Sequence, residues 1–208
     1  AYVIGGLDKQ VGIECQVYTS ENNSWLFEFP SLPKGRFNSV CFVYRDSLYV
    51  FGGTDNSSNM NEIVRYDLST QNSGEWTTIA KVNEANQRGG VAFVVEDKVY
   101  AGLGEKSNGI RNGFYVSSDS LTKWELIPSI PAQLGVISSG VYDEQKKSFF
   151  MIDNDGKIWE YNLTTEQWTS RSLWIRMKNY HMFMLDGSIY ILGQDIYQKN
   201  KFTVYNPI

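Results

Sequence analysis

The sequence predicts an all-β protein built from a repeated unit of four short strands. An aromatic residue, followed by apolar residues and then by glycine or a turn, recurs five times, with spacings of 47, 51, 50 and 40 residues. The chain shows no convincing helical periodicity. Such a period is typical of repeat architectures, in which each unit buries its faces against its neighbours. The leading aromatics are Tyr2, Tyr49, Tyr100, Phe150 and Tyr190.

Three further columns of residues keep this period and define the order of strands. Apolar segments precede the last four aromatics, at residues 40–44, 91–95, 136–142 and 181–185. Tyrosines follow the aromatics, at Tyr18, Tyr66, Tyr115, Tyr161 and Tyr205. Tryptophans come next, at Trp25, Trp76, Trp124 and Trp168. We therefore expect an apolar strand a, a strand b with the aromatic, a strand c ending near the tyrosine and a strand d beginning at the tryptophan, each of about five residues.

The short segments between strands have the residues that tight turns need. Strands a and b are joined by polar residues such as Asp186-Gly187-Ser188, which is a hairpin signal. Glycines after strand b, such as Gly52-Gly53, allow a sharp turn and a close approach of neighbouring chain segments. The tryptophans are expected to bury a large apolar area between neighbouring units.

The second unit resembles the kelch repeat. The residues that carry the resemblance are the Gly52-Gly53 pair, the Tyr66-Asp67 dipeptide and Trp76, with partial copies in the other units. The resemblance implies a kelch-type β-propeller, with four-stranded antiparallel blades around a central channel. It implies a ring of five to seven blades, with six favoured. The glycine pair is absent from the third, fourth and fifth units, so the repeats have diverged.

We expect a single propeller domain, or part of one, with eighteen strands. The blades are expected near residues 1–33 (partial), 34–84, 85–131, 132–174 and 175–208 (partial). Strand a of the first blade and strand d of the last are missing from this pattern. Because an open sheet edge invites pairing with other chains, we expect the chain to be an excerpt of a larger protein.

Charge and motif content argue against several function classes. The net charge of −4 and the pI of about 5.1 make nucleic acid an unfavourable partner. No apolar stretch is long enough for insertion into a membrane. His181 is the single histidine, and no phosphate-binding or nucleophile-elbow motif is present. We therefore expect no metal, no cofactor and no catalytic residue. Cys15 and Cys41 are expected to be buried free thiols, with a disulfide as the open alternative.

The candidate binding site lies on the face where the connections b–c and d–a gather. Its longer loops are expected at residues 7–14, 54–62, 105–113 and 194–201, and loops on a rigid scaffold usually carry function. The candidate binding residues on this face are Arg36, Arg88, Lys178, Asn179, Gln194 and Tyr197. The alternative for the basic residues is ion pairing between blades with loop acids such as Asp55, Glu62 or Glu105. Trp174 fits a buried apolar column, which leaves Tyr197 as the better exposed aromatic.

Three function classes stay open. The favoured class is a non-catalytic protein-interaction platform, the commonest use that a kelch resemblance implies. The second is a carbohydrate-binding propeller, because loops rich in Asn, Ser and Tyr suit glycans and resemble those of extracytoplasmic bacterial kelch proteins. The third is a metal-free enzyme similar to sugar mutarotases, which would use a Glu and an Arg near the channel, such as Glu105 and Arg88.

Overall fold

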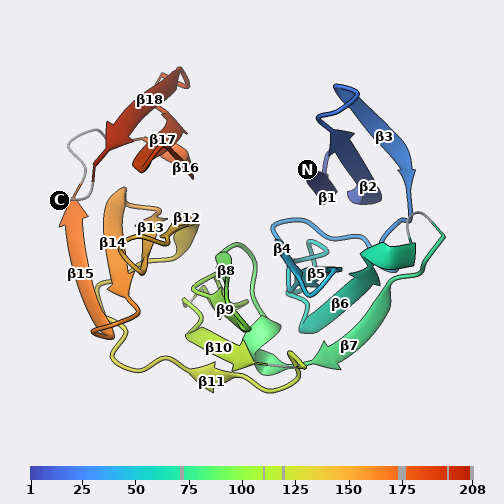
Figure 1. Ribbon diagram of the computed structural model, residues 1–208, viewed down its shortest axis with the longest axis horizontal. Helices are drawn as coiled ribbons and strands as arrows, with labels where there is room; N and C mark the ends of the chain where they lie inside the picture. The colour runs from blue at the N-terminus through green and yellow to red at the C-terminus, as the bar shows by residue number, and fades with distance from the viewer. Residues whose placement is uncertain (71–72, 110, 119, 173–176, 196, 207–208) are drawn as a thin grey trace. The chain divides into compact units, whose positions relative to one another are not determined.

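A computed structural model describes residues 1–70, 73–109, 111–118, 120–172, 177–195 and 197–206. These residues form eighteen strands in five sheets, with two short 3-10 helices (Figure 1). The chain divides into two compact units, residues 1–125 and 126–208, and each is described by itself. The all-β class and the repeated antiparallel sheets are confirmed. The favoured count of six blades finds no support, because the described residues form five sheets.

The first unit contains three sheets. Their strands are β1 (Tyr2–Leu7), β2 (Val11–Thr19) and β3 (Ser24–Phe29); β4 (Val40–Tyr44), β5 (Ser47–Phe51), β6 (Glu62–Asp67) and β7 (Thr77–Lys81); and β8 (Val91–Val95), β9 (Lys98–Gly102), β10 (Phe114–Ser118) and β11 (Glu125–Leu126). The 3-10 helices are η1 (Leu68–Thr70) and η2 (Asn83–Ala85). A long loop expected at residues 7–14 is wrong, because β1 and β2 form a hairpin whose turn contains only residues 8–10.

The second unit contains two sheets. Their strands are β12 (Ile137–Asp143), β13 (Ser148–Asp153), β14 (Lys157–Asn162) and β15 (Gln167–Ser172); and β16 (Lys178–Leu185), β17 (Ser188–Gln194) and β18 (Asn200–Tyr205). Neighbouring strands in both units follow one another in sequence, as the predicted order a, b, c, d requires. The sheets β1–β3 and β16–β18 have three strands each among the described residues. Trp174 lies outside the described residues.

Strand b packs on both of its faces, with alternate residues serving alternate faces. On β5, Val50 joins a core cluster with Cys15 and Phe29 of the preceding sheet. Tyr49 joins a different cluster with Val99 of the following sheet. Tyr49, the aromatic that begins this repeat, therefore faces the next sheet, and its neighbour Val50 faces the previous one.

The same packing rule holds in the second unit. Phe150 and Ile152 of β13 join one cluster with Ile189 and Ile191 of β17. Phe150 occupies the position of Tyr49, and Ile191 occupies the position of Val50. In both units, residues of strand b thus alternate between the two faces of their sheet, and the face that carries Tyr49 or Phe150 packs on the following sheet of the same unit.

Gly52 lets the chain between neighbouring sheets approach the end of β5 closely. Its φ is +64°, and a Cβ on this residue would collide with the carbonyl oxygen of Ala85 in η2. A non-glycine residue is therefore disfavoured here both by backbone conformation and by lack of space.

The tryptophan column is kept in three sheets as a contact with the repeated tyrosine. The rings of Tyr66 and Trp76 have centroids 5.4 Å apart, and Nε1 of Trp76 donates to the carbonyl oxygen of Pro30 at 2.8 Å. Pro30 directly follows β3, so this hydrogen bond joins neighbouring sheets. The other two such ring pairs are Tyr18–Trp25 and Tyr161–Trp168. In the sheet β8–β11, Trp124 instead packs edge-on against Phe51 of the preceding sheet.

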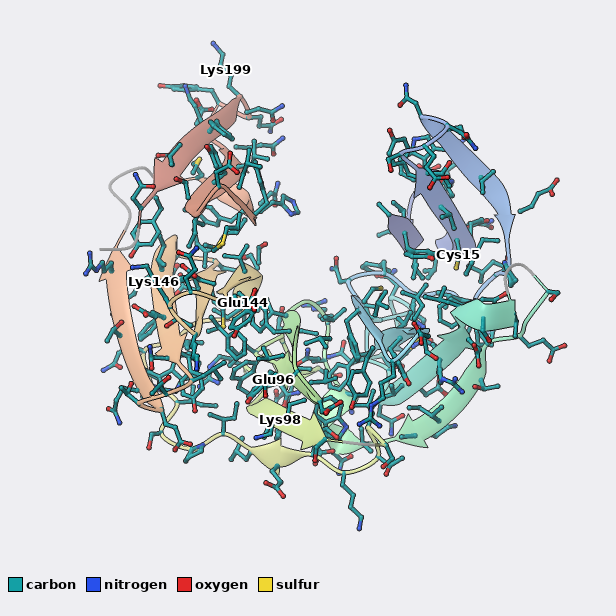
Figure 2. The ribbon with its side chains drawn as sticks, viewed as in Figure 1. Cys15, Glu96, Lys98, Glu144, Lys146 and Lys199 are labelled. Atoms are coloured by element: carbon teal, nitrogen blue, oxygen red, sulfur yellow. The ribbon has the colours of Figure 1, made fainter. Side chains whose placement is uncertain are left out.

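The two cysteines are free thiols in different environments. Cys15 is buried between β2 and the sheet β4–β7, where desolvation raises the pKa of its thiol to about 12 (Figure 2). Cys41 is exposed on β4. The prediction of a buried residue is therefore confirmed for Cys15 and wrong for Cys41.

Candidate binding surface

The predicted binding residues are divided between the two units. Arg36 and Arg88 belong to residues 1–125, whereas Lys178, Asn179, Gln194 and Tyr197 belong to residues 126–208.

Arg36 is fully buried and serves the packing of the first two sheets. Its Nη1 donates to the carbonyl oxygen of Gly52 at 3.1 Å, and its Nη2 lies 3.2 Å from Oε2 of Glu62. The carbonyl oxygen of Arg36 accepts a hydrogen bond from the backbone nitrogen of Gly6, and its own backbone nitrogen donates to the carbonyl oxygen of Gly12; both glycines belong to the preceding sheet. Desolvation lowers the pKa of the Arg36 guanidinium, and Glu62 opposes this shift. Since a ligand cannot reach this side chain, we leave Arg36 out of the proposed contact surface.

Arg88 is half-exposed and forms a two-point ion pair with Glu105. The donor–acceptor distances are 3.2 Å from Nε to Oε2 and 3.0 Å from Nη2 to Oε1. The Glu105 carboxylate raises the pKa of the Arg88 guanidinium. Arg36 and Arg88 thus pair with Glu62 and Glu105, two of the loop acids expected as partners if the basic residues form ion pairs. The pairs differ from that alternative in joining residues of the same repeat rather than neighbouring blades.

The other four predicted residues gather at one end of the sheet β16–β18. Lys178 begins β16 and lies opposite Gln194, the last residue of β17. The ladder shifts register between Lys178 and His181, and Asn179 has a φ of +54°. Nδ2 of Asn179 donates to Oε1 of Gln194 at 3.1 Å. The irregular start of β16 thus turns the Asn179 amide towards the end of β17.

A pocket of about 510 Å³ adjoins this pair of amides. Its lining is a mixture of amide, imidazole and apolar groups: Asn179, His181, Leu192, Gly193, Gln194 and Asn200. Nε2 of Gln194 lies 3.5 Å from Oδ1 of Asn200. The sequence reasoning missed Asn200. The pairing of β17 with β18 places Asn200 opposite Gln194, and no sequence pattern indicated this register.

Tyr197 stands on a loop that Asp195 braces. Oδ1 of Asp195 accepts hydrogen bonds from the backbone nitrogens of Tyr197 at 2.9 Å and Lys199 at 3.0 Å. The backbone hydrogen bond from Lys199 is the main reason that the pKa of Asp195 lies below its usual range. The Tyr197 residue is 76% exposed. Tyr197 therefore presents a large aromatic ring to solvent, and its backbone nitrogen is held by the Asp195 carboxylate.

Basic side chains outnumber acidic ones around this loop. Lys178, Lys199 and Lys201 are exposed, and Figure 2 shows Lys199 at the tip of the sheet. Asp195 is the acidic residue among them, and its Oδ2 lies 3.5 Å from Nζ of Lys201. The local charge is thus positive, although the net charge of the chain is −4.

The described part of the chain has no cluster of three or more His, Cys, Asp or Glu side chains suited to a metal ion. Within the same residues, no helix is long and apolar enough to cross a membrane.

Comparison with known proteins bears on the sheet β4–β7 and its flanks. The model of the Kelch motif matches residues 35–83, which include all four strands of this sheet. The chain contains a kelch repeat. The resemblance predicted from Gly52-Gly53, Tyr66-Asp67 and Trp76 is thereby confirmed.

The fold of this kelch-repeat chain is also found in a solved structure titled "Structure of YjhT". The two chains are 17% identical, with a TM-score of 0.77, and the match covers 99% of this chain and 80% of that chain. At this identity the likeness concerns the fold. No curated protein sequence matches the chain.

Proposed function

We propose that this chain is a non-catalytic scaffold that binds a protein partner through one loop surface. This loop surface consists of Lys178, Asn179, Gln194 and Tyr197. The observation that carries the proposal is the exposure of Tyr197 on a loop braced by Asp195. Aromatic residues dominate the energetics of protein interfaces, and a preorganised loop loses little entropy on binding. Kelch propellers commonly bind proteins, which agrees with the kelch repeat in this chain.

The charge of the loop surface indicates the kind of protein partner. Lys178 and Lys199 are exposed, and they lie at the same end of the sheet β16–β18 as the loop that carries Tyr197. Complementary charge steers association and suppresses wrong partners. The partner that fits is a protein surface with carboxylates around an apolar recess that receives the Tyr197 ring.

The test compares proteins retained from a source-cell extract by immobilised variants. The double variant Tyr197→Ala, Lys178→Ala removes the ring and one charge. The matched control is Lys146→Ala, which removes an exposed lysine from the turn between β12 and β13 (Figure 2). We expect a protein that wild type and control retain and that the double variant loses by at least about tenfold. Equal retention by all three chains would contradict the proposed surface.

A second candidate is binding of an uncharged glycan in the pocket beside this surface. The observation that favours it is the amide-rich lining, in which Asn179, Gln194 and Asn200 offer paired donors and acceptors. Calorimetric titration with neutral oligosaccharides tests it. Binding by wild type that is lost in Gln194→Ala would support this candidate, whereas no heat with any of the sugars would remove it.

No observation favours the mutarotase-like alternative. The two residues named for it, Arg88 and Glu105, bond to each other through both carboxylate oxygens. A general acid or base must be able to reach a substrate proton. In this geometry both oxygens of Glu105 are engaged by the guanidinium.

A further inference from the structure

The connection between β9 and β10 contains two Asn-Gly pairs in opposite environments. Asn108-Gly109 lies in an exposed turn, whereas Asn112-Gly113 directly precedes β10 and its asparagine is buried. We propose that Asn108 is a modification site, at which the asparagine is converted to isoaspartate and aspartate by reaction with the backbone nitrogen of Gly109.

This conversion needs no enzyme and no reactant other than water. The Gly109 nitrogen loses its proton to hydroxide and forms a bond to Cγ of Asn108. The bond from Cγ to Nδ2 then breaks, Nδ2 leaves as ammonia with a proton from water, and a cyclic imide remains. Water opens the imide on either side of its nitrogen. Cleavage next to Cγ gives aspartate, whereas cleavage next to the main-chain carbonyl carbon gives isoaspartate.

The surroundings of Gly109 leave room for the cyclic imide. Asn108 and Gly109 are both exposed, and the φ of Gly109 is +77°. Among the described residues, a Cβ built on Gly109 would have one atom outside its chain neighbours within 4 Å, Oε1 of Glu105 at 3.9 Å. Because glycine carries no side chain, its nitrogen can approach Cγ without steric hindrance.

One hydrogen bond holds the reacting nitrogen in the turn. The Gly109 nitrogen donates to the carbonyl oxygen of Lys106 at 2.9 Å, and this bond must open before the nitrogen loses its proton. Exposed turns with few buried contacts open at a small free-energy cost. The turn therefore slows the reaction without preventing it.

Asn112 is held in a network that opposes the same reaction. Its Nδ2 donates to the carbonyl oxygen of Glu84 at 2.6 Å and to Oε1 of Gln87 at 3.0 Å. Its Oδ1 accepts hydrogen bonds from the Gly113 nitrogen at 2.9 Å and from the Tyr115 hydroxyl at 3.2 Å. Asn112 is fully buried, so the water that must protonate the departing ammonia is excluded. Its conversion requires a larger opening of the structure.

Modification of Asn108 changes the loop that carries the Arg88–Glu105 ion pair. It replaces a neutral amide with a carboxylate on the connection that contains Glu105, and isoaspartate also lengthens the main chain by one carbon. A like charge near Glu105 opposes its attraction for Arg88 less in water than in the interior, so the pair is weakened rather than broken. This turn belongs to residues 1–125, so the modification is separate from the proposed loop surface in residues 126–208.

Peptide mapping of the aged chain tests the proposal with an internal control. Trypsin cleaves after Lys106, Arg111 and Lys123, so peptides 107–111 and 112–123 each carry one Asn-Gly pair. The folded chain is incubated in mildly alkaline buffer, and the mass gain from amide to acid is followed in both peptides. Isoaspartate is detected with an isoaspartyl carboxyl methyltransferase and a labelled methyl donor. We expect peptide 107–111 to be converted at least about tenfold faster than peptide 112–123.

Two controls separate the effect of the fold from that of the sequence. In a chain unfolded by urea neither pair is buried, so both peptides should be converted at similar rates. The variant Asn108→Gln removes the asparagine from the exposed turn. Aged wild type should develop a more acidic form on anion exchange, and the aged variant should not.

Three outcomes would overturn the proposal. A folded chain whose peptide 107–111 stays unmodified would show that the turn protects Asn108. Equal conversion of both peptides in the folded chain would show that the fold does not select Asn108. Aspartate without isoaspartate at this position would contradict attack by the Gly109 nitrogen.

Discussion

Replacing Trp76 should destabilise the chain more than replacing its repeat equivalent, Trp25. Both rings contact the repeated tyrosine of their own sheet at 5.4 Å. Trp76 is half-buried in a core cluster and donates to the Pro30 carbonyl at 2.8 Å, whereas Trp25 is exposed. The difference between the two variants therefore measures the packing between neighbouring sheets.

The magnitudes follow from burial and from the hydrogen bond. A fully buried tryptophan truncated to alanine costs about 3–5 kcal/mol, so the half-buried Trp76 should cost about 2–3 kcal/mol. Trp76→Phe keeps a ring and loses the bond to the Pro30 carbonyl, which should cost about 1 kcal/mol. Trp25→Ala should cost less, about 1 kcal/mol, because 45% of its surface stays exposed and its ring has no hydrogen bond to a neighbouring sheet among the bonds described.

The free energy of unfolding is measured by urea titration with far-ultraviolet circular dichroism. This signal is preferable to fluorescence, since each variant removes a fluorophore. Equal losses for Trp76→Ala and Trp25→Ala would refute the assignment of Trp76 to an interface between sheets. A Trp76→Phe variant as stable as wild type would show that the bond to Pro30 contributes nothing.

Three further predictions concern buried groups. Arg36→Ala should cost about 3 kcal/mol in urea unfolding because it breaks a buried ion pair, whereas Arg88→Ala, which breaks an exposed pair, should cost under about 1 kcal/mol; similar losses would contradict the difference in burial. Gly52→Ala should lower stability by at least about 2 kcal/mol more than Gly187→Ala, since both have positive φ but only the first methyl collides with backbone, and equal melting temperatures would be inconsistent with this. Because the folded pKa of Cys15 is raised to about 12, its contribution to stability is full below the ordinary thiol pKa and is lost as the pH rises towards about 12. Cys15→Ala should therefore weaken the alkaline loss of stability between about pH 8 and pH 10, and an unchanged pH profile would count against burial of the thiol.

The repeat period predicted the strands because each strand is short and alternates between two packed faces. Residues 40–44 and 91–95 coincide with β4 and β8. The expected strand at 181–185 proved to begin at Lys178, because an irregular register extends β16 beyond the regular apolar pattern. Boundaries that depend on such an irregularity leave no periodic signal in the sequence.

The candidate site was less predictable because it depends on contacts between distant residues. A basic residue ahead of strand a is compatible with exposure or with burial. The structure buries Arg36, since Glu62 and the Gly52 carbonyl lie within its reach. Arg36 and Arg88 look alike in sequence and differ in burial. The exposure of Tyr197 could be predicted from the sequence, because an aromatic residue outside all repeat columns has no position in the repeated core.

Hydrogen exchange of the chain in the presence of a protein retained in the capture experiment tests the proposed loop surface most directly. Binding should slow exchange at the backbone amides of Tyr197 and Lys199, and at those of Lys178 and Asn179. The turn between β16 and β17, at Asp186, lies at the opposite end of the same sheet and should be unaffected. Protection confined to that turn, with unchanged exchange at Tyr197, would contradict the account.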